Sequence, residues 1–536
     1  MNGVSYRMKS WKRKLPQTVL AVSVAASLTA CSGGASNETP ETPAAAENAD
    51  PNAPVTVEAS WMYEWWKPKV WGSDPVTKAL TEKTGVTFQF NGVSGDGNEK
   101  ASIMLLAKDY PEVMWMDRGP VLDKYIAAGA LYPIDELAEK YSYKDILTKH
   151  IPQGAVDALR KPDGHVYGIP NWFNEKGEFS VGGSFSVRND IYAKLGTPQF
   201  KTVDELTEYL RKVRDSKLTI DGKAVYAIGF QGVTENVERI ANLWGAQNSS
   251  SRYYDAGEKR VKHFIRGEST LNALKWMNTL YKEKLLDPEN FTYKTEQFDE
   301  AAAKGRYAVI VANFWDLWKA SEVLKMTDPQ AFYKAVPHPA GTAGVKPNGD
   351  GYDKTGWNVA VITKNAKNPK KIMEFFNYYL SPEGQILSFY GIEGQTWENV
   401  NGKPMLKPGV YEEIMKDSEG YGKKTGVRYL DLNQYQKYNW ERDAEAPDRR
   451  ADRALVEAVN FDATQLRILT LNGESKEGIA FANMTSAIDT ELTKIIMAGS
   501  QEEVVTLYNE LIKKLEKQGL KGVEDAWTAM YNEKNK

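Results

Sequence analysis

Cysteine and histidine are scarce in this chain, which has one Cys and four His among 536 residues. A single thiol has no disulfide partner within its own chain, so we expect packing and hydrogen bonds alone to hold the fold together. The histidines stand far apart, and no HExxH motif or paired spacing joins them, so we expect no zinc site. They are His150, His165, His263 and His338.

Long apolar runs and nucleotide-binding motifs are also missing. After residue 30 no stretch of about 18 apolar residues would form a membrane-spanning helix. Neither a P-loop nor a GxGxxG fingerprint occurs, so we expect no cofactor. The net charge is −3, and the first 30 residues hold five basic side chains and no acid. The remainder is therefore acidic, which argues against nucleic acid as a partner and against electrostatic binding to membranes.

The first 30 residues have the order of a secretory signal peptide. Basic residues between Arg7 and Lys14 precede an almost uncharged segment that ends in small residues. The only cysteine follows in Leu28-Thr29-Ala30-Cys31, and this arrangement resembles the lipobox of bacterial lipoproteins. In that family the cysteine becomes the lipid-carrying N-terminus, so the resemblance implies lipidation of Cys31. The alternative is an ordinary secreted protein with an incidental cysteine.

Residues 31–54 are predicted to form a spacer. Beyond alanine they carry no aliphatic or aromatic side chain, and such a segment cannot bury enough apolar surface to offset the entropy of ordering. The globular part should therefore begin near Val55. Its size of roughly 480 residues predicts two domains.

Strands and helices alternate along the globular part, which predicts an α/β fold with parallel sheets. Thr202-Val-Asp-Glu205 and Ser500-Gln-Glu-Glu503 are capping boxes that should each open a helix. Further helices are expected over 76–83, 98–108 and 369–380, and strands over 55–60, 85–90, 111–117, 183–187, 308–311 and 356–362.

Tryptophan is abundant, since fourteen of the 15 Trp follow residue 30. A core needs only a few of them, and the surplus favours a site for sugars, whose C–H faces stack on aromatic rings. Ligands of open α/β folds bind beyond the carboxyl ends of strands, so aromatic and polar residues directly after predicted strands are the candidates. Core packing is the alternative for each ring. The candidates are Trp61, Tyr63, Trp65, Trp115, Asp117, Trp172, Arg188, Trp315 and Trp357, together with Trp244 and Trp397 beside glycines in predicted loops.

Six segments, taken in this order, carry a family resemblance: 109–117, 163–170, 186–206, 305–315, 357–385 and Gly391-Ile-Glu-Gly394. Together they resemble the extracellular solute-binding proteins of bacterial ABC importers, in particular the branch with maltose- and alginate-oligosaccharide-binding proteins. The resemblance implies a two-lobed periplasmic-binding-protein-like fold, each lobe a mostly parallel sheet flanked by helices, joined by a hinge. It implies a first lobe from 55–170 and 353–400, a second lobe from 171–352 and 401–536, and crossings near 168–183, 350–357 and 395–425.

The implied function is capture of an oligosaccharide or sugar derivative between the lobes and its delivery to an ABC permease. We expect a monomer, anchored only by its lipid on the extracellular face of a Gram-positive cell. Glu64, Asp117 and Asp316 lack the spacing that would indicate a catalytic carboxylate pair, so we expect no enzyme. The alternatives are a peptide- or other solute-binding lipoprotein of the same fold, a secreted glycan-degrading enzyme, and a lipoprotein without a role in transport.

One departure from the resemblance concerns calcium. Alginate-type relatives carry a calcium loop after the helix that 203–214 matches. Here that place reads Asp215-Ser-Lys-Leu-Thr-Ile-Asp221, which lacks the alternating oxygen ligands of such a loop. We therefore expect no metal site there, and we expect the short, glycine-rich cluster Asn348-Gly-Asp350-Gly-Tyr-Asp353 to be a loop.

Overall fold

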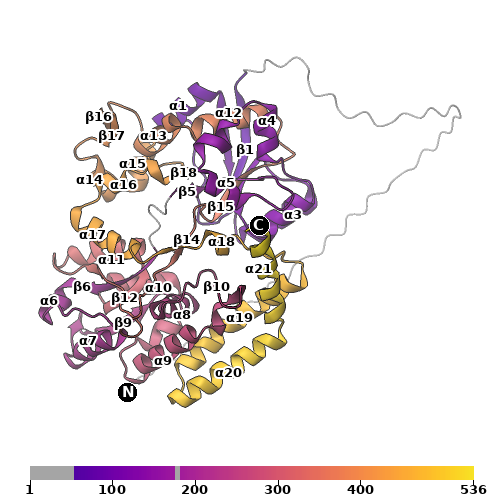
Figure 1. The fold of residues 1–536 in the computed structure, drawn as a ribbon. Coiled ribbons are helices and arrows are strands. Elements are labelled where there is room, and N and C mark those ends of the chain that lie inside the picture. Colours follow the sequence, from indigo (N-terminus) through magenta and orange to yellow (C-terminus); the bar gives the residue numbers. More distant parts are fainter. Residues whose placement is uncertain (1–52, 176–181, 536) are drawn as a thin grey trace, which may run out of the picture. The chain divides into compact units, whose positions relative to one another are not determined.

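The computed structural model describes residues 53–175 and 182–535 (Figure 1). The predicted signal peptide, Cys31 and nearly all of the predicted spacer lie outside this part. Every helix within the described residues is too short or too polar to cross a bilayer.

The first sheet has five strands, in the order β2-β1-β3-β15-β4. Four of them run in one direction, with Trp61 beside Trp115, and β15 runs antiparallel between β3 and β4, with Asn358 beside Asp117. The residues that end β1 and β3 and the residue that begins β15 therefore meet at one edge of the sheet. The strands are β1 (Val55–Trp61), β2 (Val86–Asn91), β3 (Val113–Asp117), β4 (Ile169–Pro170) and β15 (Asn358–Ile362).

The second sheet has four strands, in the order β13-β6-β12-β9. Its central strand β12 is buried along almost its whole length, as expected for a strand covered by helices on both faces. The carboxyl ends of the parallel strands β9 and β12 form one edge of this sheet. The strands are β6 (Gly183–Arg188), β9 (Tyr226–Phe230), β12 (Tyr307–Asn313) and β13 (Tyr333–Val336).

Helices cover both sheets and form the predicted caps. Thr202 Oγ1 accepts the backbone N–H of Glu205 at 3.3 Å, and Ser500 Oγ accepts that of Glu503 at 3.1 Å. Both predicted helix starts are therefore confirmed. The main helices are α1 (Pro75–Thr84), α2 (Gly97–Ala107), α3 (Pro120–Ala127), α7 (Val203–Asp215), α8 (Thr234–Ala241), α9 (Glu268–Lys282), α10 (Thr295–Ala303), α11 (Phe314–Lys325), α12 (Pro369–Tyr379), α13 (Pro382–Tyr390), α19 (Lys476–Ile496), α20 (Gln501–Lys517) and α21 (Leu520–Lys534).

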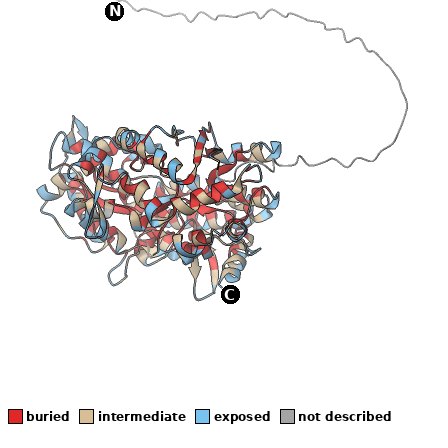
Figure 2. Ribbon diagram, turned by 90° about the horizontal axis from the view of Figure 1, so that it is seen from above, coloured by how far each residue is buried: buried red, intermediate tan, exposed pale blue. Residues whose placement is uncertain are grey.

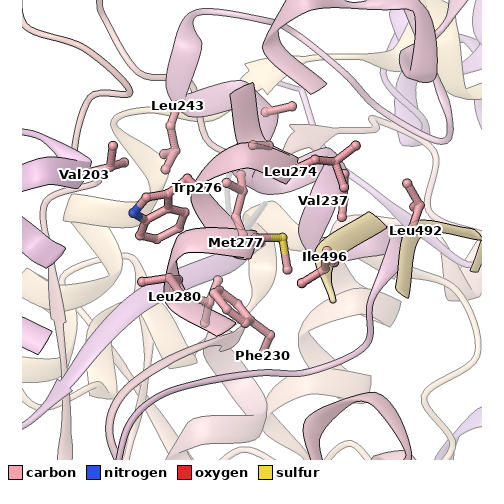
Figure 3. Packing of buried hydrophobic residues seen from close by; sticks show 14 of the residues in the cluster. Val203, Phe230, Val237, Leu243, Leu274, Trp276, Met277, Leu280, Leu492 and Ile496 are labelled. Atoms are coloured by element: carbon pink, nitrogen blue, oxygen red, sulfur yellow. The ribbon is translucent and has the colours of Figure 1, made fainter. Parts of the chain in front are cut away.

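Each sheet has its own hydrophobic core. Buried residues line the inner faces of the elements, and exposed residues follow the outer helices (Figure 2). In the second core, Met277 of α9 lies toward Ile496 of α19, whereas Trp276 lies on the side of Val203, the first residue of α7 (Figure 3). Its indole N–H donates to Thr207 Oγ1 at 2.9 Å, so the polar atom of this ring is bonded inside the core. Separate cores on the two sheets agree with the predicted division into two lobes.

Two chain segments that connect the sheets are joined by one carboxylate. Asp350 precedes β14 (Gly351–Tyr352), which pairs with β19 (Phe461–Asp462) between the sheets (Figure 1). Its Oδ2 accepts the backbone N–H of Gly183 at 2.8 Å and lies 2.9 Å from Arg239 Nη2. The crossing at 350–357 is thereby bonded to the start of β6, at the end of the other crossing.

The third predicted crossing, over 395–425, is wrong. Residues up to Trp440 pack with the first sheet, because Val410 and Trp440 share a core with Phe389 of α13. The side chain of Asn433 fixes this segment: it accepts from Trp115 Nε1 at 3.1 Å and donates to the carbonyls of Ile169 and Pro170. Contact with the second sheet begins at α17 (Pro447–Glu457), which packs on β13. The predicted assignment of 401–536 to the second lobe is therefore corrected for 401–440.

We expect Asn433→Ala to lower the free energy of unfolding by about 3 kcal/mol, because it removes the buried acceptor of Trp115 Nε1 and the buried donor to the carbonyls of Ile169 and Pro170. Asn365→Ala is the matched control. Asn365 also donates to two backbone carbonyls but is exposed, so its loss should cost less than about 1 kcal/mol. Urea denaturation measures both, and equal losses would contradict the anchoring role of Asn433.

Candidate functional site

A cluster of aromatic rings stands at the carboxyl end of β1. Trp61 is the last residue of the strand, and its ring centroid lies 6.1 Å from that of Tyr63 and 6.3 Å from that of Trp65. Trp61 is 3% exposed, whereas Trp65 is 63% exposed. The buried ring thus supports an exposed indole, which presents a rigid apolar face to solvent. A ring held in this way is suited to stacking on a ligand.

Polar groups surround Asp117, at the end of the neighbouring strand β3. Tyr63 Oη donates to Asp117 Oδ1 at 2.6 Å, and Asn98 at the start of α2 donates to Oδ2 at 3.1 Å. Burial and the hydrogen bond to Asp117 raise the pKa of Tyr63, so the phenol keeps its proton and remains a donor at neutral pH. The carboxylate is thereby held at the sheet edge beside the aromatic cluster.

Two buried polar atoms at this edge have no hydrogen-bond partner within the described residues. They are Trp61 Nε1 and Arg118 Nε. Buried polar atoms are nearly always bonded in folded proteins, so a group of exceptions in one place points to a missing partner. A polar ligand or water at the edge would supply it.

A second exposed ring comes from the residue before β15. Trp357 is 50% exposed and follows Gly356, whose φ of +64° suits glycine. A Cβ on Gly356 would stand 2.5 Å from Asn171 Oδ1 and 2.8 Å from the carbonyl oxygen of Trp172. Glycine therefore permits the close approach that brings Trp172 and Trp357 together. The structure thus gathers six of the predicted residues at one edge: Trp61, Tyr63, Trp65, Asp117, Trp172 and Trp357.

Arg118 connects this edge to the crossing. Its Nη2 lies 2.6 Å from Asp353 Oδ2, and the guanidinium also donates to Thr355 Oγ1 and to the carbonyl of Gly356. The backbone carbonyl of Arg118 in turn accepts from Thr470 Oγ1 at 3.2 Å. These bonds hold the crossing against the edge that carries Asp117 and Trp357.

A cavity of about 910 Å³, here called cavity A, opens from this edge. It begins at Asp117, Arg118 and Trp357 and continues past Arg467 to Lys534 at the end of α21. Lys534 Nζ donates to the carbonyl of Arg160 at 2.9 Å, so the last helix closes one end. The volume is within the range of small-molecule sites, which is about 300–1,000 Å³.

The edge of the second sheet carries its own polar group. Gln231, directly after β9, donates from Nε2 to Asp299 Oδ1 at 3.1 Å and to Asp316 Oδ2 at 3.3 Å. Burial and the neighbouring Asp316 raise the pKa of Asp299. Trp315 precedes Asp316 in the first turn of α11, and its ring centroid lies 5.1 Å from the Arg449 guanidinium. Sequence reasoning missed Gln231 and Asp299, although Gln231 directly follows a buried strand.

Two predicted ligand-binding residues are buried in this conformation. Trp115 is 0% exposed, because it lies on the buried face of β3 and stacks 5.8 Å from Trp61 inside the core. Arg188 is 5% exposed and forms a bidentate ion pair with Asp190, at 2.8 and 2.6 Å. Both side chains therefore have structural roles in this conformation.

Two further candidates lie away from the edge. Trp244 packs on the second core and against Gly341, where an added Cβ would stand 2.2 Å from the indole. Trp397 begins the hairpin strand β16 (Trp397–Val400) and donates to the carbonyl of Gly391 at 2.9 Å. Binding by these two residues stays a prediction. Among the described residues, no cluster of three or more His, Cys, Asp or Glu is arranged to hold a metal ion.

Comparison with known proteins identifies relatives of this chain. The family model described as bacterial extracellular solute-binding protein matches residues 67–386. The fructooligosaccharide ABC transporter substrate-binding protein FusA of Streptococcus pneumoniae is 22% identical over 336 residues, which span 60% of this chain and 60% of FusA. Lipoprotein LipO of Bacillus subtilis is 23% identical over 64% of this chain and 67% of LipO. The chain thus matches less than two thirds of the length of FusA.

Solved structures share the fold over almost the whole chain. Alginate-binding protein AlgQ2 aligns with a TM-score of 0.69 and 22% identity, over 90% of this chain and 98% of that chain. S. pneumoniae FusA in complex with kestose aligns with a TM-score of 0.68 and 19% identity, over 89% and 99%. The likeness confirms the predicted two-lobed periplasmic-binding-protein-like fold.

The different burial of the tryptophans has a measurable consequence. We expect Trp115→Ala to lower the free energy of unfolding by about 3–5 kcal/mol, because it opens a cavity in the core. Trp357→Ala should cost less than about 1 kcal/mol, because half of that ring is already in water. Urea denaturation of both variants measures the difference, and a large loss for Trp357→Ala would mean that this ring is structural.

Proposed function

The chain belongs to the bacterial extracellular solute-binding proteins, the family that its ordered motifs resemble, and on this footing we propose that it is the substrate-binding protein of an ABC transporter for an oligosaccharide or sugar derivative. The observation that carries the proposal is the pair of exposed rings, Trp65 and Trp357, on either side of the bonded carboxylate of Asp117. Sugars combine apolar C–H faces with hydroxyl groups, so rings beside a carboxylate match both parts of their surface.

The two sheet edges make different contacts with the ligand. The first edge supplies stacking and the Asp117 carboxylate, and the second supplies Gln231, Asp299 and Trp315. A ligand that contacts both edges favours the conformation in which they approach each other, so binding shifts an open–closed equilibrium toward the closed form. The bond of Arg118 to the crossing gives this movement a direct path to the site. No bond is made or broken in the ligand.

Lipidation of Cys31 would hold the protein at the outer face of the membrane, beside the permease that receives the ligand. Support comes from the lipobox-like sequence and from the similarity to a protein named as a lipoprotein, LipO. The relatives are named as substrate-binding, extracellular-binding or lipoproteins, which fits a role in binding rather than catalysis.

The first test is a thermal-shift screen of the Cys31→Ser chain against mono- and oligosaccharides, because a ligand that binds only the folded state raises the melting temperature. We expect one glycan class to raise it and to remain unhydrolysed. Release of free sugar would favour the enzyme, and a shift with peptides alone would favour the peptide-binding alternative.

Binding should depend on the exposed rings. We expect Trp65→Ala and Trp357→Ala each to weaken binding of that glycan at least tenfold, about 1.4 kcal/mol, in isothermal titration calorimetry. Trp276→Phe is the control, because its indole is buried in the second core and was not predicted to bind, and its affinity should stay within twofold. If both alanine variants bind as the parent does, the edge of the first sheet is not the binding site.

A further inference from the structure

A second, smaller cavity continues from cavity A. This cavity B has a volume of about 330 Å³ and shares Ser250 and Arg467 with cavity A. Its walls come from α8, from the loop that follows that helix and from the crossing at Asp350 and Gly351, close to α18 (Thr464–Arg467) and β10 (Arg252–Asp255) in Figure 1. A ligand in cavity A that extends past Arg467 would enter cavity B.

The lining of cavity B is polar. It includes the amides of Asn242 and Asn248, three consecutive serines at 249–251, and charged groups of both signs. Among the residues that the structure describes, no aromatic ring lines it. Stacking therefore cannot be the mode of binding here, and hydrogen bonds must hold an occupant.

Asn248 is the residue that points to a ligand. It is 2% exposed, lines cavity B, and its Nδ2 has no hydrogen-bond partner in the described part of the chain. Its backbone N–H and carbonyl are both bonded to the Asn242 side chain, at 2.8 and 3.2 Å, so the loop is already held without the Asn248 amide. A buried donor without a partner costs stability, and a ligand acceptor would remove that cost.

Glu238 also lines cavity B, and its carboxyl can accept a hydrogen bond from a ligand hydroxyl group or donate one to it. Its Oε2 accepts the backbone N–H of Ser251 at 2.8 Å. Burial raises the pKa of this carboxyl to about 7, the Ser251 N–H lowers it, Asp350 raises it, and Arg252 and Arg467 lower it. Near neutral pH the carboxyl is therefore partly protonated, and it can either accept or donate a hydrogen bond.

The charged side chains that line cavity B limit the class of ligand that it can bind. Glu235, Glu238 and Asp350 line cavity B together with Arg239 and Arg467, and Arg239 is already paired with Asp350. The acids disfavour an anion, and the guanidinium groups disfavour a divalent cation. An uncharged, hydroxyl-rich unit remains, because each hydroxyl group both donates and accepts.

We propose that cavity B is an end pocket that binds one terminal sugar unit of the ligand by hydrogen bonds alone, with Asn248 donating to one hydroxyl group and Glu238 bonded to another. The inference rests on the proposed sugar-binding function and specifies it: the ligand has one unit that stacks at Trp357 and one that does not stack. The volume matches the lower limit of small-molecule sites.

The test combines a stability measurement with a binding measurement on the Cys31→Ser chain. Asn248→Leu removes the unpaired donor, so we expect it to raise the melting temperature of the ligand-free protein. Asn248→Ala is the second variant, in case leucine does not fit. Asn242→Leu is the matched control: its amide is fully bonded to Asn248 and Gly349, so its loss should lower the melting temperature.

Binding is measured by calorimetry with glucose, galactose, mannose and fructose and their di- and trisaccharides, with glycine and diglycine as zwitterionic probes. We expect both Asn248 variants to weaken binding of the sugar that binds the parent at least tenfold. If Trp357→Ala weakens binding and the Asn248 variants do not, the end pocket is overturned while the sugar-binding function stands. Binding of the zwitterions alone, or of none of these sugars, overturns both. A lower melting temperature for both Asn248 variants would overturn the end pocket by showing that the amide is structural.

Discussion

The carboxylate of Asp350 is the contact on which the arrangement of the two sheets depends. It accepts the backbone N–H of Gly183 and pairs with Arg239, so two passages of the chain between the sheets share one partly buried ion pair. Little space is left around it, because a Cβ on Gly183 would stand 1.8 Å from Arg239 Nε. A hinge absorbs changes in backbone dihedral angles at a few residues, and this pair fixes the residues on one side of the crossings.

A series of direct contacts leads from that hinge to the candidate site. Three residues after Asp350 in the same crossing, Asp353 holds Arg118, and Arg118 follows Asp117 at the end of β3. The crossing then passes through Gly356 to Trp357, the exposed ring beside cavity A. In the proposed open–closed equilibrium, these contacts would carry a change at the hinge to the carboxylate and the ring.

Cavities A and B share Ser250 and Arg467 but differ in the rest of their lining residues. This difference would make an elongated ligand bind in one orientation. Cavity A starts at an exposed indole, whereas the described lining of cavity B is hydroxyl, amide and charged. A chain of similar sugar units would find stacking at one end and hydrogen bonds at the other. The unpaired amide of Asn248 costs stability in the free protein, which is common where a binding site is prepared in advance.

The sequence by itself determined the local structure and the class of fold. Capping residues at Thr202 and Ser500, buried strand runs such as 308–311, and the ordered family motifs are all short-range signals, and the helices and strands that they predict are present. The sequence also identified six residues that meet at one sheet edge, because aromatic residues after parallel strands must gather there.

Only the tertiary structure decided which aromatic rings are exposed to a ligand. Trp61 ends β1 and Trp65 follows it, yet their exposed fractions are 3% and 63%, because burial depends on what packs against each face. The same reason applies to Asn433, Gln231 and Asn248: their roles arise from partners or cavities formed by distant segments, which no local pattern of residues records.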